Sequence, residues 1–178
     1  MRTDRLSREY DVEFRWYVFP LHPETPEEGA ELTDLLRIAP EQLGPMQARV
    51  REVAAAEGLP LAERSRTYNS RRAQELGKWA ESLGKGDAWR QAVYRAFFVE
   101  GCNIAHVEEL ARLAAEVGLS GAEAKAVLAE GRFAAAVDAD WQRAEEYGIT
   151  AVPSHLCEGI RLVGFAKYQD FQRLIGRG

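Results

Sequence analysis

The stretch at residues 149–164 reads ITAVPSHLCEGIRLVG. It holds two short runs rich in apolar and β-branched residues, separated by Glu158 and Gly159. An acidic or amide residue followed by glycine is typical of a two-residue hairpin turn. We therefore predict a β-hairpin whose first strand starts at the Val152-Pro153 pair. The segment that follows, 166–175, predicts a helix with one apolar face, which carries Tyr168, Phe171, Leu174 and Ile175.

A second strand is predicted near the start of the chain, over Tyr10 to Phe19 (YDVEFRWYVF). Apolar and polar residues alternate along this segment, which stops before Pro20. The apolar positions, expected to face a core, are Val12, Phe14, Trp16 and Val18.

The residues between these strands predict helices. Thr25, Pro26 and Glu28 have the order of an N-cap, a first-turn proline and a capping-box acid, so a helix is expected from about Pro26 towards Ile38. Helical ends are expected at Gly118 and Gly148, and a second capping box at Ser120 and Glu123. The apolar residues at helical spacing, all expected in a core, are Met46, Val50, Val53, Leu76, Trp79, Ala80, Leu83, Trp89, Val93, Phe97, Phe98, Phe133, Val137, Trp141 and Tyr147.

Length and charge restrict the function. A chain of 178 residues, 46% of them hydrophobic, can form one substantial core. The net charge of -5, with basic residues spread among acidic ones, argues against a nucleic-acid partner. No run approaches the roughly 20 apolar residues of a membrane span, and the first ten residues do not read as a signal peptide, so no membrane partner and a cytoplasmic location are expected.

Two cysteines occur, Cys102 and Cys157. Their separation allows neither a Cys-x-x-Cys pair nor a cysteine cluster for zinc, so no metal and no tightly bound cofactor are expected. Two reduced thiols are the expected state in a cytosolic protein, although a disulfide between them is possible in principle.

Five segments in order resemble the DsbA-like oxidoreductases of the FrnE branch of the thioredoxin superfamily. They are FPLHPETPEEG (19–29), YNSRRA (68–73), RAFFVEGCN (95–103), LARLAAEVGL (110–119) and YGITAVP (147–153). The resemblance as a whole extends over nearly the whole chain, from about Val12 to Ile175. The resemblance implies an α/β, thioredoxin-like fold with a large all-helical insertion. Residues 1–24 and 149–178 would form the thioredoxin-like core, and residues 25–148 the insertion with its connecting helices.

The same resemblance implies that the family's first core strand and its Cys-x-x-Cys helix are absent from this sequence, which begins with what resembles the tail of that helix, Leu6 to Tyr10. In the family the helix N-terminus stabilises the attacking thiolate. The catalytic residues are therefore unknown here.

The resemblance also implies a substrate-binding position. Val152-Pro153 matches the family's cis-proline, so Val152, Pro153 and Ser154 are expected to contact substrate; the alternative is a trans proline that starts a strand. His22 stands at a position that resembles one where the family has an asparagine near the site. It either contacts the bound thiol or makes a structural contact in the loop.

Three other groups of residues could carry chemistry. Cys157 and His155 stand two apart on a strand, which permits an activated Cys-His pair, although an apolar cysteine and a structurally paired histidine are the simpler interpretation. Cys102 lies in a loop with no close cation to activate it. Arg71 and Arg72 open a helix and could bind a carboxylate of glutathione, or else form ion pairs such as one with Glu75.

Three functions follow as hypotheses. In the first, the natural product is a thiol-disulfide oxidoreductase acting on a thiol- or disulfide-bearing protein or peptide, and its catalytic element lies upstream of Met1. In the second, the chain is a redox-inactive protein that binds peptides or a partner, with a homo-oligomer formed through an open sheet edge. In the third, it is a relative of the glutathione-dependent isomerases and kappa-class transferases, with glutathione as thiol co-substrate.

Overall fold

The computed structural model describes residues 2–176, which form two compact units. The described residues up to Leu21, together with those from Ala139 onward, form one unit, here called the terminal unit. His22–Asp138 form the other, here called the helical unit. The predicted division into a thioredoxin-like core and an insertion, with its boundaries at 24 and 148, stays a prediction.

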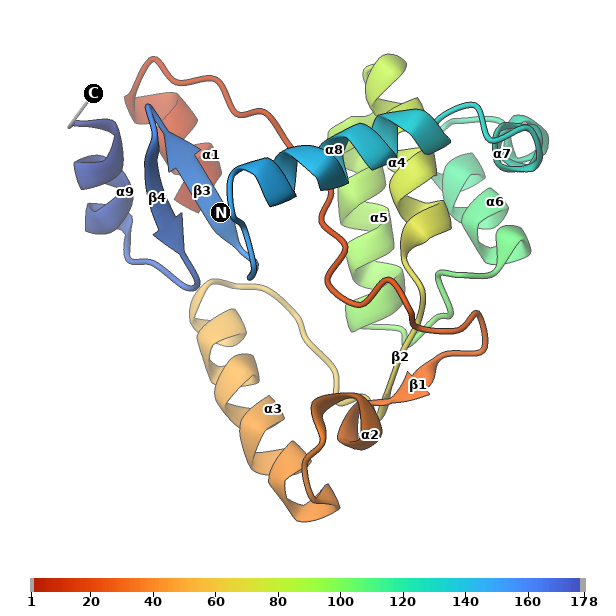
Figure 1. The fold of residues 1–178 in the computed structure, drawn as a ribbon, viewed down its shortest axis with the longest axis horizontal. Helices are drawn as coiled ribbons and strands as arrows, with labels where there is room; N and C mark the ends of the chain where they lie inside the picture. The colour runs from red at the N-terminus through yellow and green to blue at the C-terminus, as the bar shows by residue number, and fades with distance from the viewer. Residues whose placement is uncertain (1, 177–178) are drawn as a thin grey trace. The chain divides into compact units, whose positions relative to one another are not determined.

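The terminal unit contains two short helices and a hairpin (Figure 1). The two short helices are α1 (Arg2–Glu9) and α9 (Tyr168–Ile175), and the hairpin consists of β3 (Ser154–Cys157) and β4 (Ile160–Val163). The last part of α8 (Ala134–Glu146) also belongs to this unit. Its core is small: Leu6, Ala166 and Phe171 are buried. Partly buried residues pack against that core, namely Val12, Phe14, Leu162, Tyr168 and Ile175.

The predicted hairpin is confirmed. β3 and β4 pair antiparallel, with Cys157 opposite Ile160 and Ser154 opposite Val163. The two turn residues have positive φ, 47° at Glu158 and 81° at Gly159, as a type I′ turn requires. The predicted helix after it is α9, and its Phe171 and Leu174 are buried.

The helical unit holds a larger core. Its elements in chain order are β1 (Ala30–Glu31), α2 (Leu32–Leu36), α3 (Pro40–Ala56), β2 (Arg66–Thr67), α4 (Arg71–Ser82), α5 (Gly86–Phe98), α6 (Val107–Glu116), α7 (Gly121–Ala129) and the first turns of α8. α4 packs against α5 and α7, and α6 packs against α5 and α7. The buried residues between these helices include Leu76, Trp79, Trp89, Leu110, Leu113 and Val127.

Two local predictions in this unit are confirmed. The hydroxyl of Ser120 accepts a hydrogen bond of 3.2 Å from the Glu123 backbone N–H, which caps α7. Gly118 follows α6 with φ of 79°, a conformation that glycine adopts without strain.

The predicted strand over Tyr10 to Phe19 is wrong, because none of its residues forms a ladder in the described structure. The alternation is visible only at its start, where Val12 and Phe14 are partly buried, whereas Trp16 is 43% exposed. A strand needs a neighbour for its backbone groups. Here the N–H of Val18 donates instead to the carboxylate of Asp140 at 3.0 Å.

The predicted helix over Pro26 to Ile38 is also wrong in extent: only Leu32–Leu36 are helical. Ala30 and Glu31 instead pair with Thr67 and Arg66. Gly29 (φ of 86°) lies so close to that strand that an added Cβ would be 2.6 Å from the carbonyl oxygen of Thr67. Thr25 caps nothing, because its buried hydroxyl has no hydrogen-bond partner among the described residues.

Five residues expected in a core are exposed. α3 forms as a helix of 17 residues but buries none of them, so its apolar side does not face a core. The exposed residues are Trp16, Met46, Val50, Leu83 and Tyr147.

Candidate functional site

The candidate site is built on the start of β3. The Val152–Pro153 peptide bond is cis. The carbonyl of Pro153 accepts a 2.8 Å hydrogen bond from the N–H of Gly164, and the Ser154 hydroxyl donates to the carbonyl of Ala151 at 2.7 Å. These two hydrogen bonds hold the backbone in place at the start of β3, one to β4 and one to the residue before Val152.

The register shows which backbone groups of β3 face away from β4. Opposite residues in an antiparallel ladder alternate between pairs that exchange hydrogen bonds and pairs that do not. The bond from Gly164 to Pro153 makes that pair a bonded one, so the pair formed by Ser154 and Val163 is not, and neither is the pair formed by Leu156 and Arg161. The N–H and C=O groups of Ser154 and Leu156 therefore point away from β4.

The far edge of β3 is open within residues 2–176, because the sheet that contains β3 has only two strands. Three large apolar side chains of the hairpin and its approach are exposed: Val152 (45%) and Leu156 (41%) on the β3 side, and Val163 (51%) on β4. Leu156 and Val163 share one face of the hairpin, since side chains on a strand alternate in direction. The site is therefore an unpaired strand edge with apolar side chains beside it.

His155 lies on the opposite face of β3. Its ring packs edge-on against Phe171, with ring centroids 4.7 Å apart, and its buried Nδ1 has no hydrogen-bond partner among the described residues. Cys157 is a half-buried free thiol on the same face. No hydrogen bond joins the two side chains in the described structure, so the activated Cys-His pair stays a hypothesis without a supporting contact.

Burial lowers the pKa of His155, which makes the terminal unit sensitive to acid. The neutral ring is favoured in the folded state, so this stabilisation is complete above the unfolded pKa of about 6.5 and is lost as pH falls through the lower folded value. We expect denaturant unfolding to show a loss of stability between about pH 8 and about pH 5 that is smaller in His155→Leu. His22 and His106 are present in both proteins, so an equal loss in the two would contradict this role.

The remaining predicted site residues belong to the helical unit. His22 is exposed, and its carbonyl accepts a bond from the N–H of Thr25. Cys102 is half-buried, and burial together with Glu109 raises the pKa of its thiol, so the protonated form prevails at neutral pH.

The paired arginines are engaged by protein groups. Arg71 forms ion pairs with Glu75 (2.9 Å) and Asp138 (2.6 Å), and Arg72 pairs with Glu27 (2.7 Å). These contacts favour the structural interpretation of both residues over a site for glutathione.

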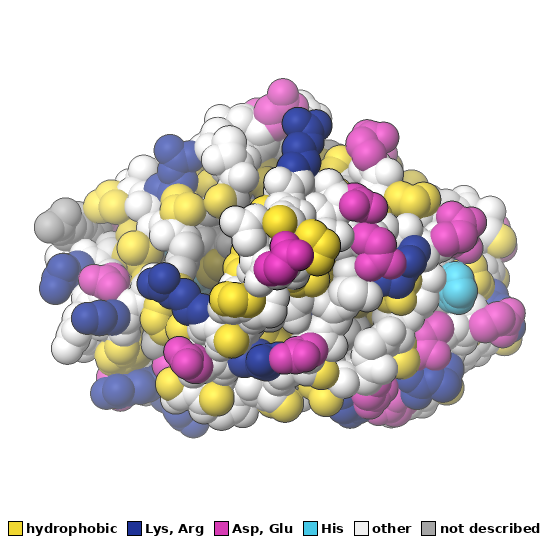
Figure 2. Space-filling model, turned by 90° about the horizontal axis from the view of Figure 1, so that it is seen from below, with side chains coloured by type: hydrophobic (Ala, Val, Ile, Leu, Met, Phe, Trp, Pro, Cys, Tyr) yellow, Lys and Arg dark blue, Asp and Glu magenta, His cyan; other side chains and the backbone are white. Residues whose placement is uncertain are grey.

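Neither a membrane span nor a metal centre is present in residues 2–176. Each helix there is too short or too polar to cross a bilayer, and no three acidic, histidine or cysteine side chains gather as ligands. On the face drawn in Figure 2, basic and acidic side chains are interspersed, with apolar groups between them. That face offers no continuous basic area for a polyanion.

Comparison with known proteins establishes the family. A family model described as the DSBA-like thioredoxin domain matches residues 1–176. The chain belongs to the DSBA-like thioredoxin domain family. The predicted α/β, thioredoxin-like fold class is thereby confirmed.

Three relatives show how far this likeness extends. A probable DsbA oxidoreductase from Streptomyces coelicolor is 26% identical with a TM-score of 0.81, over 88% of this chain and 71% of that one. A 2-hydroxychromene-2-carboxylate isomerase is 18% identical with a TM-score of 0.76, over 99% and 86%, which is a likeness of fold. The uncharacterized protein YwbO of Bacillus subtilis is 34% identical over 98 residues, which are 54% of this chain and 49% of that protein. The matched part thus spans about half the length of this curated relative.

Proposed function

We propose that this DSBA-like chain holds an extended, thiol- or disulfide-bearing peptide along the open edge of β3. The observation that carries the proposal is the unpaired edge itself. Ser154 and Leu156 each present an N–H and a C=O away from β4, directly after the Val152-Pro153 pair. An extended peptide adds to such an edge as a further strand.

The side chains around the edge favour an apolar peptide. Leu156 exposes apolar surface on the strand that an added strand would pair with, so alternate residues of the added strand would cover it, and Val163 extends this apolar face onto β4. Arg161 lies directly opposite Leu156 on the same face, and its guanidinium is bound to the carbonyls of Tyr147 and Gly148. The face therefore has no free cation to select an acidic peptide.

We infer that these residues bind rather than oxidise or reduce. The sequence contains no Cys-x-x-Cys, and each of its two thiols is free. Cys102 has a raised pKa, whereas exchange requires a thiolate. Two alternative partners are glutathione and a second copy of the chain. Arg71 and Arg72 are already ion-paired, which argues against glutathione. A second copy would pair through the same open edge.

A proline scan of the hairpin tests the proposal. Leu156→Pro removes an N–H that faces the open edge, and Val163→Pro removes one that faces away from β3 at the other edge, so neither change breaks a bond between the two strands. With a labelled peptide of alternating valine and threonine around one cysteine, we expect Leu156→Pro to weaken binding about tenfold or more. Val163→Pro should keep the affinity within about twofold, measured by fluorescence anisotropy.

A cysteine-free variant separates binding from covalent capture. Cys102→Ser combined with Cys157→Ser should bind the same peptide with unchanged affinity, since no exchange step is involved. Equal losses in the two proline variants, or loss of binding in the cysteine-free protein, would contradict the proposal.

A further inference from the structure

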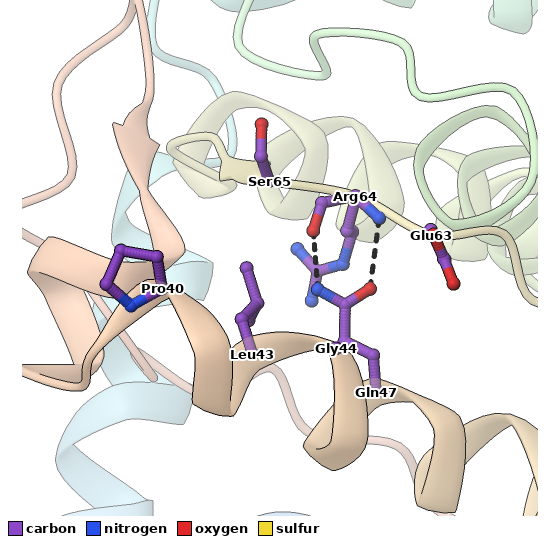
Figure 3. A pocket seen from close by; sticks show the side chains of 7 residues that line it. All are labelled: Pro40, Leu43, Gly44, Gln47, Glu63, Arg64 and Ser65. Carbon is purple, nitrogen blue, oxygen red and sulfur yellow. Dashed lines mark hydrogen bonds between the residues drawn. The ribbon is translucent and has the colours of Figure 1, made fainter.

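A pocket of about 290 Å³ lies in the helical unit, between α3 and the segment that leads into β2 (Figure 3). It has no part in the proposed peptide site, and no sequence pattern indicated it. Its lining residues are Pro40, Leu43, Gly44, Gln47, Glu63, Arg64 and Ser65.

The side chain of Gln47 on α3 joins the two walls of the pocket by bonding to the backbone of Arg64. The Gln47 amide accepts a bond of 3.0 Å from the N–H of Arg64 and donates one of 2.5 Å to its carbonyl, as the dashed lines in Figure 3 show. Both ends of the amide are thereby used. Gln47 fixes the position of Arg64 and has little hydrogen-bonding capacity left for a ligand.

The guanidinium of Arg64 is partly desolvated, and it has no carboxylate partner among residues 2–176. It lies over the rings of Phe97 and Phe98, at 4.5 and 5.2 Å from their centroids, and burial lowers its pKa. Nη1 donates to the carbonyl of Arg66 at 3.3 Å. No hydrogen bond or ion pair of Arg64 in residues 2–176 involves an acidic side chain, so its remaining N–H groups are available to an acceptor in the pocket.

The rest of the lining adds apolar surface, and its acidic residue already has a cationic partner. Glu63 is the acidic residue of the lining, and it is paired with Arg51. Pro40 and Leu43 supply carbon surface. At Gly44 the space where a Cβ would stand is empty to at least 4 Å.

We propose that this pocket binds a small organic carboxylate with an apolar body, anchored by the guanidinium of Arg64. A planar guanidinium matches a carboxylate with two parallel hydrogen bonds, and contact with the rings of Phe97 and Phe98 restricts where the guanidinium can lie. The pocket's volume of about 290 Å³ leaves room for a ligand of that kind.

Benzoate is the probe for a first test, with benzamide as its uncharged counterpart. In an amide NMR titration of the full chain we expect saturable binding of benzoate, with a dissociation constant of about 1 mM or tighter and shifts at residues 40–47 and 63–66. Benzamide and inorganic phosphate should each bind about tenfold more weakly, because one lacks the charge and the other the apolar body. No saturation by benzoate, or equal binding of either control, overturns the proposal.

Three variants separate ligand binding from a structural role of Arg64. Arg64→Gln removes the charge. Gly44→Leu fills the pocket while Arg64 itself stays unchanged, and it raises the helix propensity of α3. Both should weaken benzoate binding about tenfold or more, whereas Arg49→Gln, which removes an exposed arginine of α3 outside the lining, should leave it within about twofold. Unchanged binding in Gly44→Leu overturns the proposal even if Arg64→Gln fails to fold.

Discussion

Trp89→Ala should lower the free energy of unfolding of the helical unit by about 3–5 kcal/mol, the usual cost of deleting a large buried aromatic side chain. Trp89 is 2% exposed in the core between the helices, and its indole N–H donates to the carbonyl of Ala73 at 3.0 Å. Its ring also lies 3.4 Å from where a Cβ at Gly77 would stand, so α4 and α5 meet tightly over it. Urea unfolding followed by far-ultraviolet circular dichroism measures the loss.

Trp89→Phe provides the matched control. It keeps most of the buried carbon surface and removes the hydrogen bond, which costs about 0.5–1.5 kcal/mol, plus a small cavity. If Trp89→Ala cost no more than Trp89→Phe, the core assigned to α4 and α5 would be wrong.

Arg71→Ala should destabilise the same unit by about 3 kcal/mol, the lower end of the cost of breaking a buried ion pair. Glu75, its partner, is only 8% exposed and would be left with an uncompensated charge. The change also removes contacts to α8, namely the ion pair with Asp138 and a hydrogen bond of 3.0 Å to the carbonyl of Ala134.

The neighbouring arginine is the control for this variant. Arg72 has a side chain that is 39% exposed, and its partner Glu27 is 49% exposed. Arg72→Ala should therefore cost about 1 kcal/mol or less by the same urea unfolding measurement. Equal costs for the two variants would show that burial of Glu75 does not govern the effect, and they would reopen the carboxylate-binding interpretation of the pair.

The accurate predictions from sequence rest on local chemistry. The turn at Glu158 and Gly159 and the cap at Ser120 are set by residues within a few positions of one another. The helix with Phe171 and Leu174 on one face follows from the same short-range periodicity. Local signals of this kind were sufficient for the hairpin that carries the candidate site.

The wrong predictions concern segments whose state depends on distant neighbours. Tyr10 to Phe19 has a strand pattern, but a pattern does not supply the partner that a ladder requires. α3 has apolar residues at helical spacing, yet Met46 and Val50 are 42% and 54% exposed because no element of the described structure buries them. Helical periodicity therefore located α3 but not the side of it that is buried.

The open edge and the pocket differ in how far sequence could reveal them. The hairpin and the Val152-Pro153 pair marked the region of the edge, although the outward direction of Ser154 and Leu156 required the register. Arg64 gave no signal, because it stands in a polar stretch and reaches Phe97 and Phe98 only through tertiary folding. Such a site is visible only in three dimensions.

Hydrogen exchange at the four amides of β3 tests whether a peptide binds along the open edge of this strand. On addition of the valine-threonine peptide, the amides of Ser154 and Leu156 should become protected from exchange, because the peptide would bond the edge they face. The amides of His155 and Cys157, which face β4, should change little. Peptide binding without new protection at Ser154 and Leu156 would contradict the assignment of this edge as the peptide site.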